Sequence, residues 1–287
     1  MHLTIYISFL AATLSSLLVL PLISGLAIPN IEKRIINGFE MPDAFSAGIV
    51  YVVQNLGSAI GSCGGSILSE KFIITAAHCM INEQNGIAVP DKVAIGYGSS
   101  DLTQQKSARA KKITLHPNFN TQHIDGMADI AIIEIEPLTF GGNIQRIPIF
   151  NGNIPVGQTF LAAGWGVTET GQPSTGPLRG VLVQSGSASE CSMFSQDFVD
   201  NNGAQICLPE SRTPGKMTDS GDSGTGLFVY SGDVIMLAGI DSVAAQMYNQ
   251  TLNDIDTVHL NVHLAYYLDF ISNTTGLAKS YLTGSDS

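Results

Sequence analysis

The sequence predicts an all-β protein built from two packed six-stranded antiparallel barrels and a C-terminal helix. The chain is 44% apolar and only 13% charged, a composition that forms a core. Its 30 glycines and 12 prolines separate short apolar runs, which is typical of β proteins rich in turns. These runs fall into two groups of six on either side of a linker, residues 136–156, and this arrangement indicates two barrels.

The first barrel is expected over about residues 35–140, with strands at 47–53, 65–68, 72–75, 92–96, 111–115 and 130–135. The second is expected over about 155–262, with strands at 159–164, 180–185, 205–208, 226–230, 234–240 and 258–262. A terminal helix is predicted at 263–271, where Leu264, Tyr267, Leu268 and Ile271 recur at helical spacing. Residues 273–287 are expected to form a polar, frayed tail.

The N-terminal segment predicts export from the cell. Residues 3–26 are almost wholly apolar and uncharged, and Gly25-Leu26-Ala27 matches a signal-peptidase site. We therefore expect a signal peptide at 1–27 and a secreted, extracellular protein, with a retained signal anchor as the alternative. No later segment has transmembrane length, so no stable membrane span is expected. Glycosylation sequons at Asn249 and Asn273 agree with secretion.

The four cysteines, Cys63, Cys79, Cys191 and Cys207, indicate two disulfides in a secreted chain. Four cysteines allow three pairings, and proximity in sequence favours Cys63–Cys79 and Cys191–Cys207. A metal site is the alternative, but the chain has neither a C-x-x-C motif nor clustered histidines. We expect no metal and no cofactor. The net charge of −11 argues against a nucleic-acid partner, because such proteins carry basic patches.

Three short motifs supply the parts of a nucleophilic catalytic site. They contain His78 in Thr-Ala-Ala-His-Cys, Asp129 before a β-prone run, and Ser223 in Gly-Asp-Ser-Gly. A serine hydroxyl attacks only when an imidazole accepts its proton and a carboxylate holds the imidazole. Asp125 is the alternative acid, although its Ile-Asp-Gly context is typical of a turn.

With these motifs, residues 35–272 resemble a chymotrypsin-type (trypsin-like) serine protease. The matching segments, in order, are 35–38, 64–68, 75–79, 129–131, 164–166 and 221–224. The resemblance implies protein or peptide substrates and possible protein inhibitors. It also implies an oxyanion hole formed by the N–H groups of Gly221 and Ser223, and a hydrogen bond from Ser242 to the orienting acid. His116, His123, His259 and His263 lack such context and are interpreted as structural.

Residues 28–34 are predicted to be an activation propeptide that ends in Lys33-Arg34. The resemblance implies that cleavage after Arg34 frees the amine of Ile35, which pairs with Asp222 and shapes the oxyanion turn. The chain is therefore expected to be a zymogen. A dibasic-specific or trypsin-like protease would activate it.

The specificity pocket departs from the family pattern. Met217 occupies the floor position, Asp219 replaces an expected cysteine, and the pocket walls carry Ser242-Val243-Ala244 and Thr257. Thr218 lies between the two floor-loop residues. Because Ala244 and Thr257 would narrow the pocket, we expect small or medium apolar side chains before the scissile bond. The alternative is trypsin-like preference for Lys or Arg through Asp219 or Asp241.

Two other functions compete with the endopeptidase. A protease-like binding protein would use the same fold without catalysis, although such homologues usually lose a member of the triad. An esterase of the α/β-hydrolase type is excluded for two reasons. Such esterases carry a Gly-x-Ser-x-Gly motif, which residues 221–225 do not match, and their catalytic residues follow a different order along the chain.

Overall fold

The computed structural model describes residues 38–121, 127–166, 176–195, 198–216, 218, 221–249 and 254–285. All of them lie within one compact unit of the chain, Glu32–Ser287. The signal peptide, the propeptide, Ile35, His123, Asp125, Met217 and Asp219 lie outside the described residues. None of the described helices is both long enough and apolar enough to cross a membrane.

The first half of the chain forms the predicted closed six-stranded barrel, in the order β2-β3-β4-β7-β6-β5. The strands are β2 (Ile49–Asn55), β3 (Ile60–Ser69), β4 (Phe72–Thr75), β5 (Val93–Tyr97), β6 (Lys106–Leu115) and β7 (Ala131–Ile135). The strands pair antiparallel with their neighbours. Their inward side chains, including Ile67, Ile73, Ile95 and Ile133, are fully buried. β-Branched residues suit this setting because they pack well on a pleated, buried surface.

The second half forms a seven-stranded antiparallel sheet in the order β1-β9-β8-β11-β12-β13-β10. Its strands are β1 (Phe39–Glu40), β8 (Thr159–Gly164), β9 (Arg179–Gln184), β10 (Gln205–Pro209), β11 (Gly226–Ser231), β12 (Val234–Asn249) and β13 (Asp254–His263). All six predicted strands are present. Two features differ from the predicted second barrel: the described strands form a seven-stranded sheet and not a closed six-stranded barrel, and β1 adds to β9 at one edge. A hydrogen bond from Gly186 N–H to the Cys207 carbonyl, 2.9 Å, links the end of β9 to β10 at the other edge.

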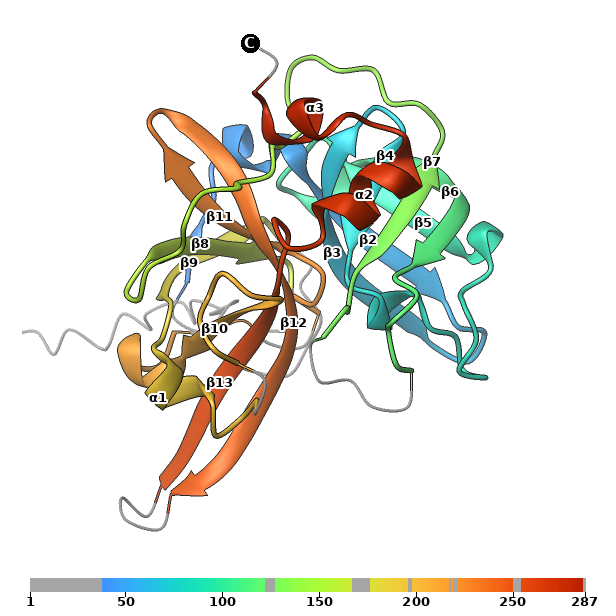
Figure 1. Cartoon of the computed structure of the whole chain (residues 1–287). Coiled ribbons are helices and arrows are strands. Elements are labelled where there is room, and N and C mark those ends of the chain that lie inside the picture. Colours follow the sequence, from blue (N-terminus) through green and yellow to red (C-terminus); the bar gives the residue numbers. More distant parts are fainter. Residues whose placement is uncertain are drawn as a thin grey trace, which may run out of the picture. The chain divides into compact units, whose positions relative to one another are not determined.

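The β12–β13 hairpin is much longer than predicted. Its two strands pair from Gly239↔His263 out to Asn249↔Asp254. Figure 1 shows this ribbon, in orange and red, extending away from the rest of the second sheet. The pairing shifts register between Ile240 and Val243, so Asp241 and Ser242 lie in a bulge. Such bulges redirect side chains and are frequent beside active sites.

The C-terminal region differs from the sequence prediction. Residues 264–267 form a turn, and the helix α2 runs over Leu268–Thr275 instead of 263–271. The expected frayed tail instead contains a further helix, α3 (Lys279–Thr283). Leu282 of α3 is 2% exposed, and its carbonyl accepts a hydrogen bond from Ile149 N–H at 2.8 Å. This buried contact orders the tail although its composition is polar.

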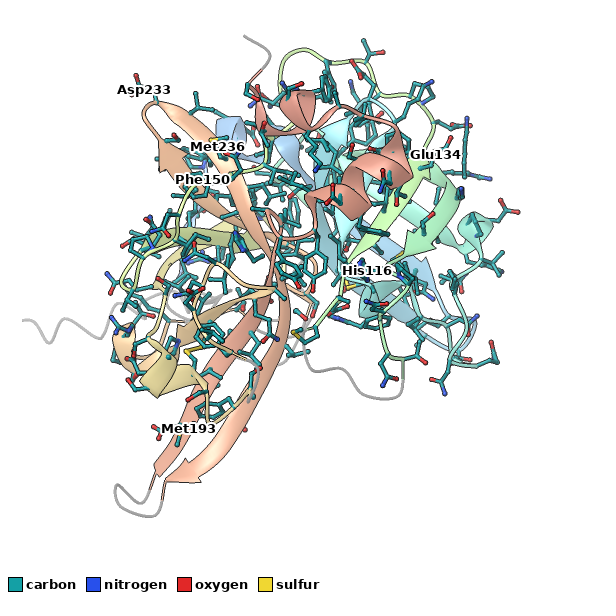
Figure 2. All side chains as sticks on the ribbon, viewed as in Figure 1. His116, Glu134, Phe150, Met193, Asp233 and Met236 are labelled. Atoms are coloured by element: carbon teal, nitrogen blue, oxygen red, sulfur yellow. A yellow bond between two sulfur atoms is a disulfide. The ribbon has the colours of Figure 1, made fainter. Side chains whose placement is uncertain are left out.

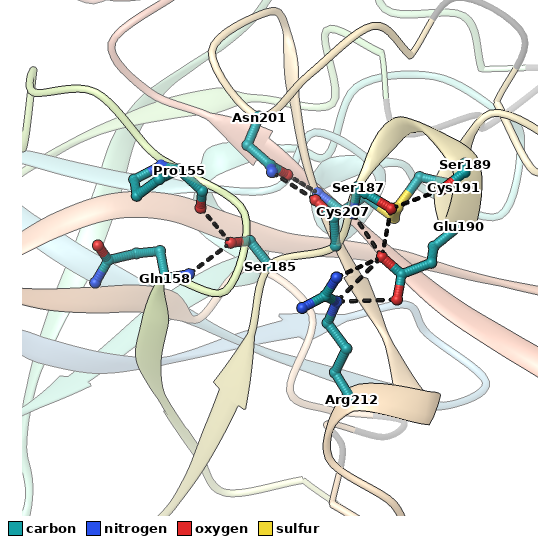
Figure 3. Close-up of polar contacts among 11 residues, drawn as sticks. Pro155, Gln158, Ser185, Ser187, Ser189, Glu190, Cys191, Asn201, Cys207 and Arg212 are labelled. Carbon is teal, nitrogen blue, oxygen red and sulfur yellow. Dashed lines mark hydrogen bonds and ion pairs between the residues drawn. A yellow bond between two sulfur atoms is a disulfide. The ribbon is translucent and has the colours of Figure 1, made fainter.

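The remaining elements are short. A four-residue helix, α1 (Ala188–Cys191), starts with a capping box formed by Ser187 and Glu190. Arg212 donates hydrogen bonds to the same Glu190 carboxylate (Figure 3), which lowers the Glu190 pKa to about 2 in spite of a burial effect that acts to raise it. In the part of the chain that the structure describes, five 3₁₀ helices occupy loops: η1 (Asp43–Gly48), η2 (His78–Met80), η3 (Pro90–Lys92), η4 (Leu102–Gln104) and η5 (Glu210–Arg212).

The two disulfides have the predicted pairing, Cys63–Cys79 and Cys191–Cys207. The first ties β3 to the 3₁₀ helix η2, which carries His78. The second ties α1 to β10. No cysteine of the chain is free.

Candidate active site

His78 and Asp129 meet because the strands that lead to them are paired. β4 ends at Thr75, three residues before His78, and β7 begins at Ala131, two residues after Asp129; Thr75 and Ala131 are direct partners. The Asp129 carboxylate contacts both the backbone N–H and the ring Nδ1 of His78. Its Oδ1 accepts the His78 backbone N–H at 2.8 Å, and its Oδ2 lies 2.7 Å from His78 Nδ1.

Asp129 is fully buried, yet its environment favours the ionised carboxylate. Burial acts to raise its pKa and is the largest influence. The hydrogen bond and charge of His78, with further hydrogen bonds from the Ser242 hydroxyl and the His78 backbone, outweigh burial and hold the pKa of Asp129 below its usual range. Ser242 Oγ donates to Oδ2 at 2.5 Å. A buried carboxylate requires such partners.

The Asp129 contact determines which nitrogen of His78 carries the proton. An ionised carboxylate only accepts hydrogen bonds, so Nδ1 must be the N–H donor. In the neutral ring Nε2 then carries the lone pair, as a general base requires. Burial is the largest influence on the His78 pKa and acts to lower it. Asp129, assisted by the charge of Asp241, outweighs it and raises that pKa.

Ser223 lies in a tight turn between β-segments. Gly221 and Gly224 have φ angles of 91° and 80°, a region that side-chain-bearing residues rarely adopt. Two hydrogen bonds of 2.8 Å anchor the turn to both sheets, from Gly64 N–H to the Ser223 carbonyl and from Gly224 N–H to the Asp241 carbonyl. The sequence thus holds a half-buried serine on a constrained turn.

Ser223 and His78 line one cleft of about 300 Å³. Within the described residues, no hydrogen bond joins the Ser223 hydroxyl to His78 Nε2, which instead lies 3.6 Å from Cys79 Sγ. Catalytic hydrogen bonds are often long in unliganded enzymes and shorten when substrate binds. Among described residues, the single group of potential metal ligands is Cys63, His78 and Cys79. Its two sulfurs form a disulfide, so it lacks the thiolates that a metal would need.

The order of these segments along the chain and their geometry agree with the comparison to known families. Residues 37–271 match the sequence model of the trypsin family. This chain belongs to the trypsin family of serine proteases. Serine protease 1 of Drosophila melanogaster is 30% identical over 255 residues, which cover 83% of this chain and 89% of that protein.

Two further relatives come from other arthropods. Trypsin 5G1 of Aedes aegypti is 30% identical over 197 residues, 67% of this chain and 69% of that protein. Brachyurin of Leptuca pugilator is 31% identical over 219 residues, 75% of this chain and 88% of that protein. The family implies a hydrolase that acts on proteins.

In this trypsin-family chain, Asp222 is completely buried beside the nucleophile turn. Its Oδ1 accepts the Gly166 N–H at 2.8 Å, and its carbonyl accepts the Thr225 N–H at 2.9 Å. A side chain at Gly166 would collide with this carboxyl, because its Cβ would lie 2.5 Å from the carboxyl carbon. The expected partner of Asp222, the Ile35 amine, lies outside the described residues.

The predicted pocket residues are only partly brought together. Val243 and Ala244 continue the β12 ladder opposite Leu260 and His259. Thr257 instead lines a separate cavity of about 220 Å³ with Glu190, Met193 and Phe194. Its place on the long hairpin explains this position, because Thr257 pairs with Gln246, farther along the ribbon than Val243 and Ala244.

A buried polar network joins Thr218, Asp241 and His259, and it was not predicted. Thr218 Oγ1 donates to Asp241 Oδ1 at 3.0 Å and lies 3.2 Å from Nδ1 of His259. All three side chains are buried. Burial raises the pKa of Asp241 although the charge of His259 and the Thr218 hydrogen bond oppose the rise. His259, interpreted from sequence as structural, therefore belongs to a network that adjoins Ser242.

The contact that Tyr267 makes beside the site was not predicted either. Its hydroxyl accepts the Ala128 N–H at 2.9 Å, and Ala128 has a φ of 54°. Ala128, whose backbone is strained in this way, directly precedes Asp129. His116, labelled in Figure 2, packs edge-on against Tyr267 and Phe270 with ring centroids 5.2 and 4.7 Å away. That packing agrees with the structural role predicted for His116.

The two sequons lie in different settings. Asn249 is the last residue of β12, at the far end of the hairpin. Asn273 is an exposed residue of α2.

Proposed function

We propose that this chain is a secreted serine endopeptidase in which Ser223 attacks, His78 transfers the proton and Asp129 orients His78. The observation that carries the proposal is the 2.7 Å contact between His78 Nδ1 and the buried Asp129 carboxylate. It leaves Nε2 as the proton acceptor in the cleft that Ser223 also lines. Family membership alone would not support catalysis, because it does not require an intact set of these groups.

The reaction follows from these positions. Ser223 Oγ bonds to the substrate carbonyl carbon while its proton passes to His78 Nε2. The N–H groups of Gly221 and Ser223 would bind the resulting oxyanion, and losing one such donor costs about 3–4 kcal/mol. His78 then gives its proton to the leaving amine as the C–N bond breaks. Water then attacks the acyl-enzyme through the same proton transfers by His78, and Ser223 is restored.

Activity is proposed to depend on processing. Removal of residues 1–27 on secretion and cleavage after Arg34 would free the Ile35 amine to pair with Asp222. The complete burial of Asp222 supports a charged partner for it, since a stranded buried charge is costly. Proteases that cut after Lys33-Arg34 are the proposed activators, and protein inhibitors are proposed to bind the same cleft.

For the residue before the scissile bond, small or medium apolar side chains are the proposed preference. Asp241 is only 6% exposed and already accepts a hydrogen bond from Thr218, which leaves little of it for a substrate cation. This favours the apolar alternative over Lys or Arg. Trypsin-like preference through Asp219 is the second alternative.

Comparison of the wild-type chain with Arg34→Gln and Ser223→Ala tests the proposal. Each is secreted, treated with a trypsin-like activator that is then inhibited, and given peptides with Ala, Leu, Phe or Arg before the cleaved bond. Hydrolysis is expected from the cleaved wild type alone, most rapidly after Ala or Leu. Full activity of uncut Arg34→Gln would disprove the zymogen mechanism. No hydrolysis by cleaved wild type would favour a non-catalytic binding protein.

A further inference from the structure

The cleft beside Ser223 extends into a cavity whose walls are mostly apolar. Its volume is about 300 Å³. It is lined by Gly221, Ser223 and His78, and by residues of β2, the loop after it, β3 and the segment after His78: Val52, Gln54, Leu56, Gly61, Ser62, Cys63, Cys79, Met80 and Ile81. Apart from His78, none of the described lining side chains can carry a charge, because both cysteines are in a disulfide.

The apolar character is concentrated at two accessible side chains. Leu56 and Ile81 are half-buried, whereas Val52 and Met80 are buried behind them. Leu56 lies over Gly61, since a Cβ at that glycine would be 3.5 Å from its Cδ1. A leucine and an isoleucine that keep apolar surface in a cleft can bury it against a ligand.

The walls are held in place by hydrogen bonds. The buried Gln54 amide donates to the Ile81 carbonyl at 3.2 Å, and the Ser58 hydroxyl donates to the Glu83 carboxylate. Asn82 fixes the next turn by accepting the N–H groups of Gln84 and Gly86 at 3.0 and 2.9 Å. A wall that is ordered before binding loses little conformational entropy when a ligand enters.

The position of the cavity relative to the reacting atoms decides which part of a substrate enters it. His78 must give its proton to the leaving amine, so the chain after the scissile bond must leave along the His78 side. The cavity lies on that side, against Cys79, Met80 and Ile81, and no residue of β12 lines it. The acyl part of the substrate therefore lies elsewhere.

We infer that this cavity selects an apolar side chain of about leucine size in the first two residues after the scissile bond, with Leu56 and Ile81 as the specificity-determining residues. This inference rests on the proposed function. It is independent of the residue before the scissile bond, because none of the described residues predicted for that pocket lines the cavity: Thr218, Ser242, Val243, Ala244 and Thr257.

Acyl transfer measures this selection directly. An ester substrate acylates Ser223, and an added dipeptide amide competes with water for the acyl-enzyme. The amine nitrogen bonds to the acyl carbon, the carbon–Oγ bond breaks, and the amine proton passes through His78 to Ser223 Oγ. The probes are Leu-Gly-NH₂, Gly-Leu-NH₂ and their asparagine isosteres, Asn-Gly-NH₂ and Gly-Asn-NH₂. The ratio of aminolysis to hydrolysis is measured by chromatography.

At one of the two positions, the leucine probe is expected to be captured about tenfold better than its isostere, as for small apolar groups in other enzyme pockets. Leu56→Asn and Ile81→Asn should each reduce this ratio to about threefold or less. The matched control is Ile60→Asn, because Ile60 is 74% exposed on the same hairpin and does not line the cavity; it should keep the wild-type ratio. Fluorophosphonate titration of active sites corrects for misfolded protein.

Equal capture of leucine and asparagine probes at both positions, while the ester is hydrolysed, would overturn the inference and leave the proposed function standing. Loss of selection in Ile60→Asn but not in the two cavity variants would also overturn it. If the cleaved wild type does not hydrolyse any ester, the proposed function itself fails and this inference fails with it.

Discussion

The Ser242 hydroxyl donates a 2.5 Å hydrogen bond to Oδ2 of Asp129, and this bond joins the second sheet to the barrel at the carboxylate that we propose orients His78. Ser242 lies in the β12 bulge of the second sheet, whereas Asp129 directly precedes β7 of the barrel. The same oxygen faces His78 Nδ1. Correct docking of the two sheets is therefore a condition for orienting His78.

Replacing Asp129 with asparagine should reduce kcat by about 10⁴-fold. The amide cannot hold Nδ1 as the N–H donor, so Nε2 would carry the proton and could not accept one from Ser223. Ser242→Ala should reduce kcat by only about 10- to 100-fold, the value of one hydrogen bond to a charged group. Steady-state kinetics on both variants checks this order. A decrease of less than tenfold in Asp129→Asn would contradict the assigned role.

The pH dependence of kcat/KM should show an acid limb centred above the ordinary histidine value of 6.5, because the pKa of His78 is raised. Neutral His78 is the active form, so activity rises with pH through that pKa. The charge of Asp241 contributes to the rise. Asp241→Asn should therefore move the limb to lower pH.

Glu136→Gln is the control for this charge effect, since Glu136 is an exposed carboxylate that follows the end of β7, whereas Asp129 precedes its start. Its acid limb should coincide with that of the wild type. An unchanged limb in Asp241→Asn would show that Asp241 does not act on His78.

Gly166→Ala should lower kcat/KM by at least about tenfold, because the new Cβ would lie 2.5 Å from the Asp222 carboxyl carbon and such overpacking costs about 1–3 kcal/mol. Gly203→Ala is the matched control, since the nearest atom to its Cβ is 3.8 Å away. Peptide hydrolysis by both activated variants measures the effect. Equal activities would mean that the position of Asp222 is unimportant.

Leu282→Ala should destabilise the protein by about 2–5 kcal/mol, as expected for a buried leucine. Leu282 is 2% exposed, and its carbonyl accepts the hydrogen bond from Ile149 N–H of the linker. Lys279→Ala should cost less than about 1 kcal/mol, because its ion pair with Asp269 is exposed on both sides. Urea unfolding of the two variants compares them. A Leu282→Ala midpoint equal to that of Lys279→Ala would contradict the docked tail.

The local pattern was sufficient to predict most of the fold. Runs such as 72–75 and 159–164 coincide with β4 and β8, because apolar β-prone residues bounded by turn residues carry their own signal. Disulfide pairing also followed from proximity. The length of the β12–β13 hairpin and the helix α3 were missed, since both depend on pairing and burial that composition does not encode.

The candidate site was also predictable only in part. His78, Asp129 and Ser223 lie in recognisable motifs, so their roles could be predicted from the sequence. The Thr218–Asp241–His259 network and the Tyr267 hydrogen bond to Ala128 could not. Their partners are far apart in the chain and meet only when the second sheet and the C-terminal segment are in place.

In the proposed mechanism, Ser223 becomes a nucleophile once the chain is cut between Arg34 and Ile35. Mass-spectrometric mapping of a fluorophosphonate adduct tests this most directly, on cut chain, uncut chain and cut His78→Ala. Ser223 should be modified rapidly in the cut wild type and slowly or not at all in the other two. A folded, correctly cut chain that carries no adduct, or carries it on another serine, would disprove the proposed role of Ser223.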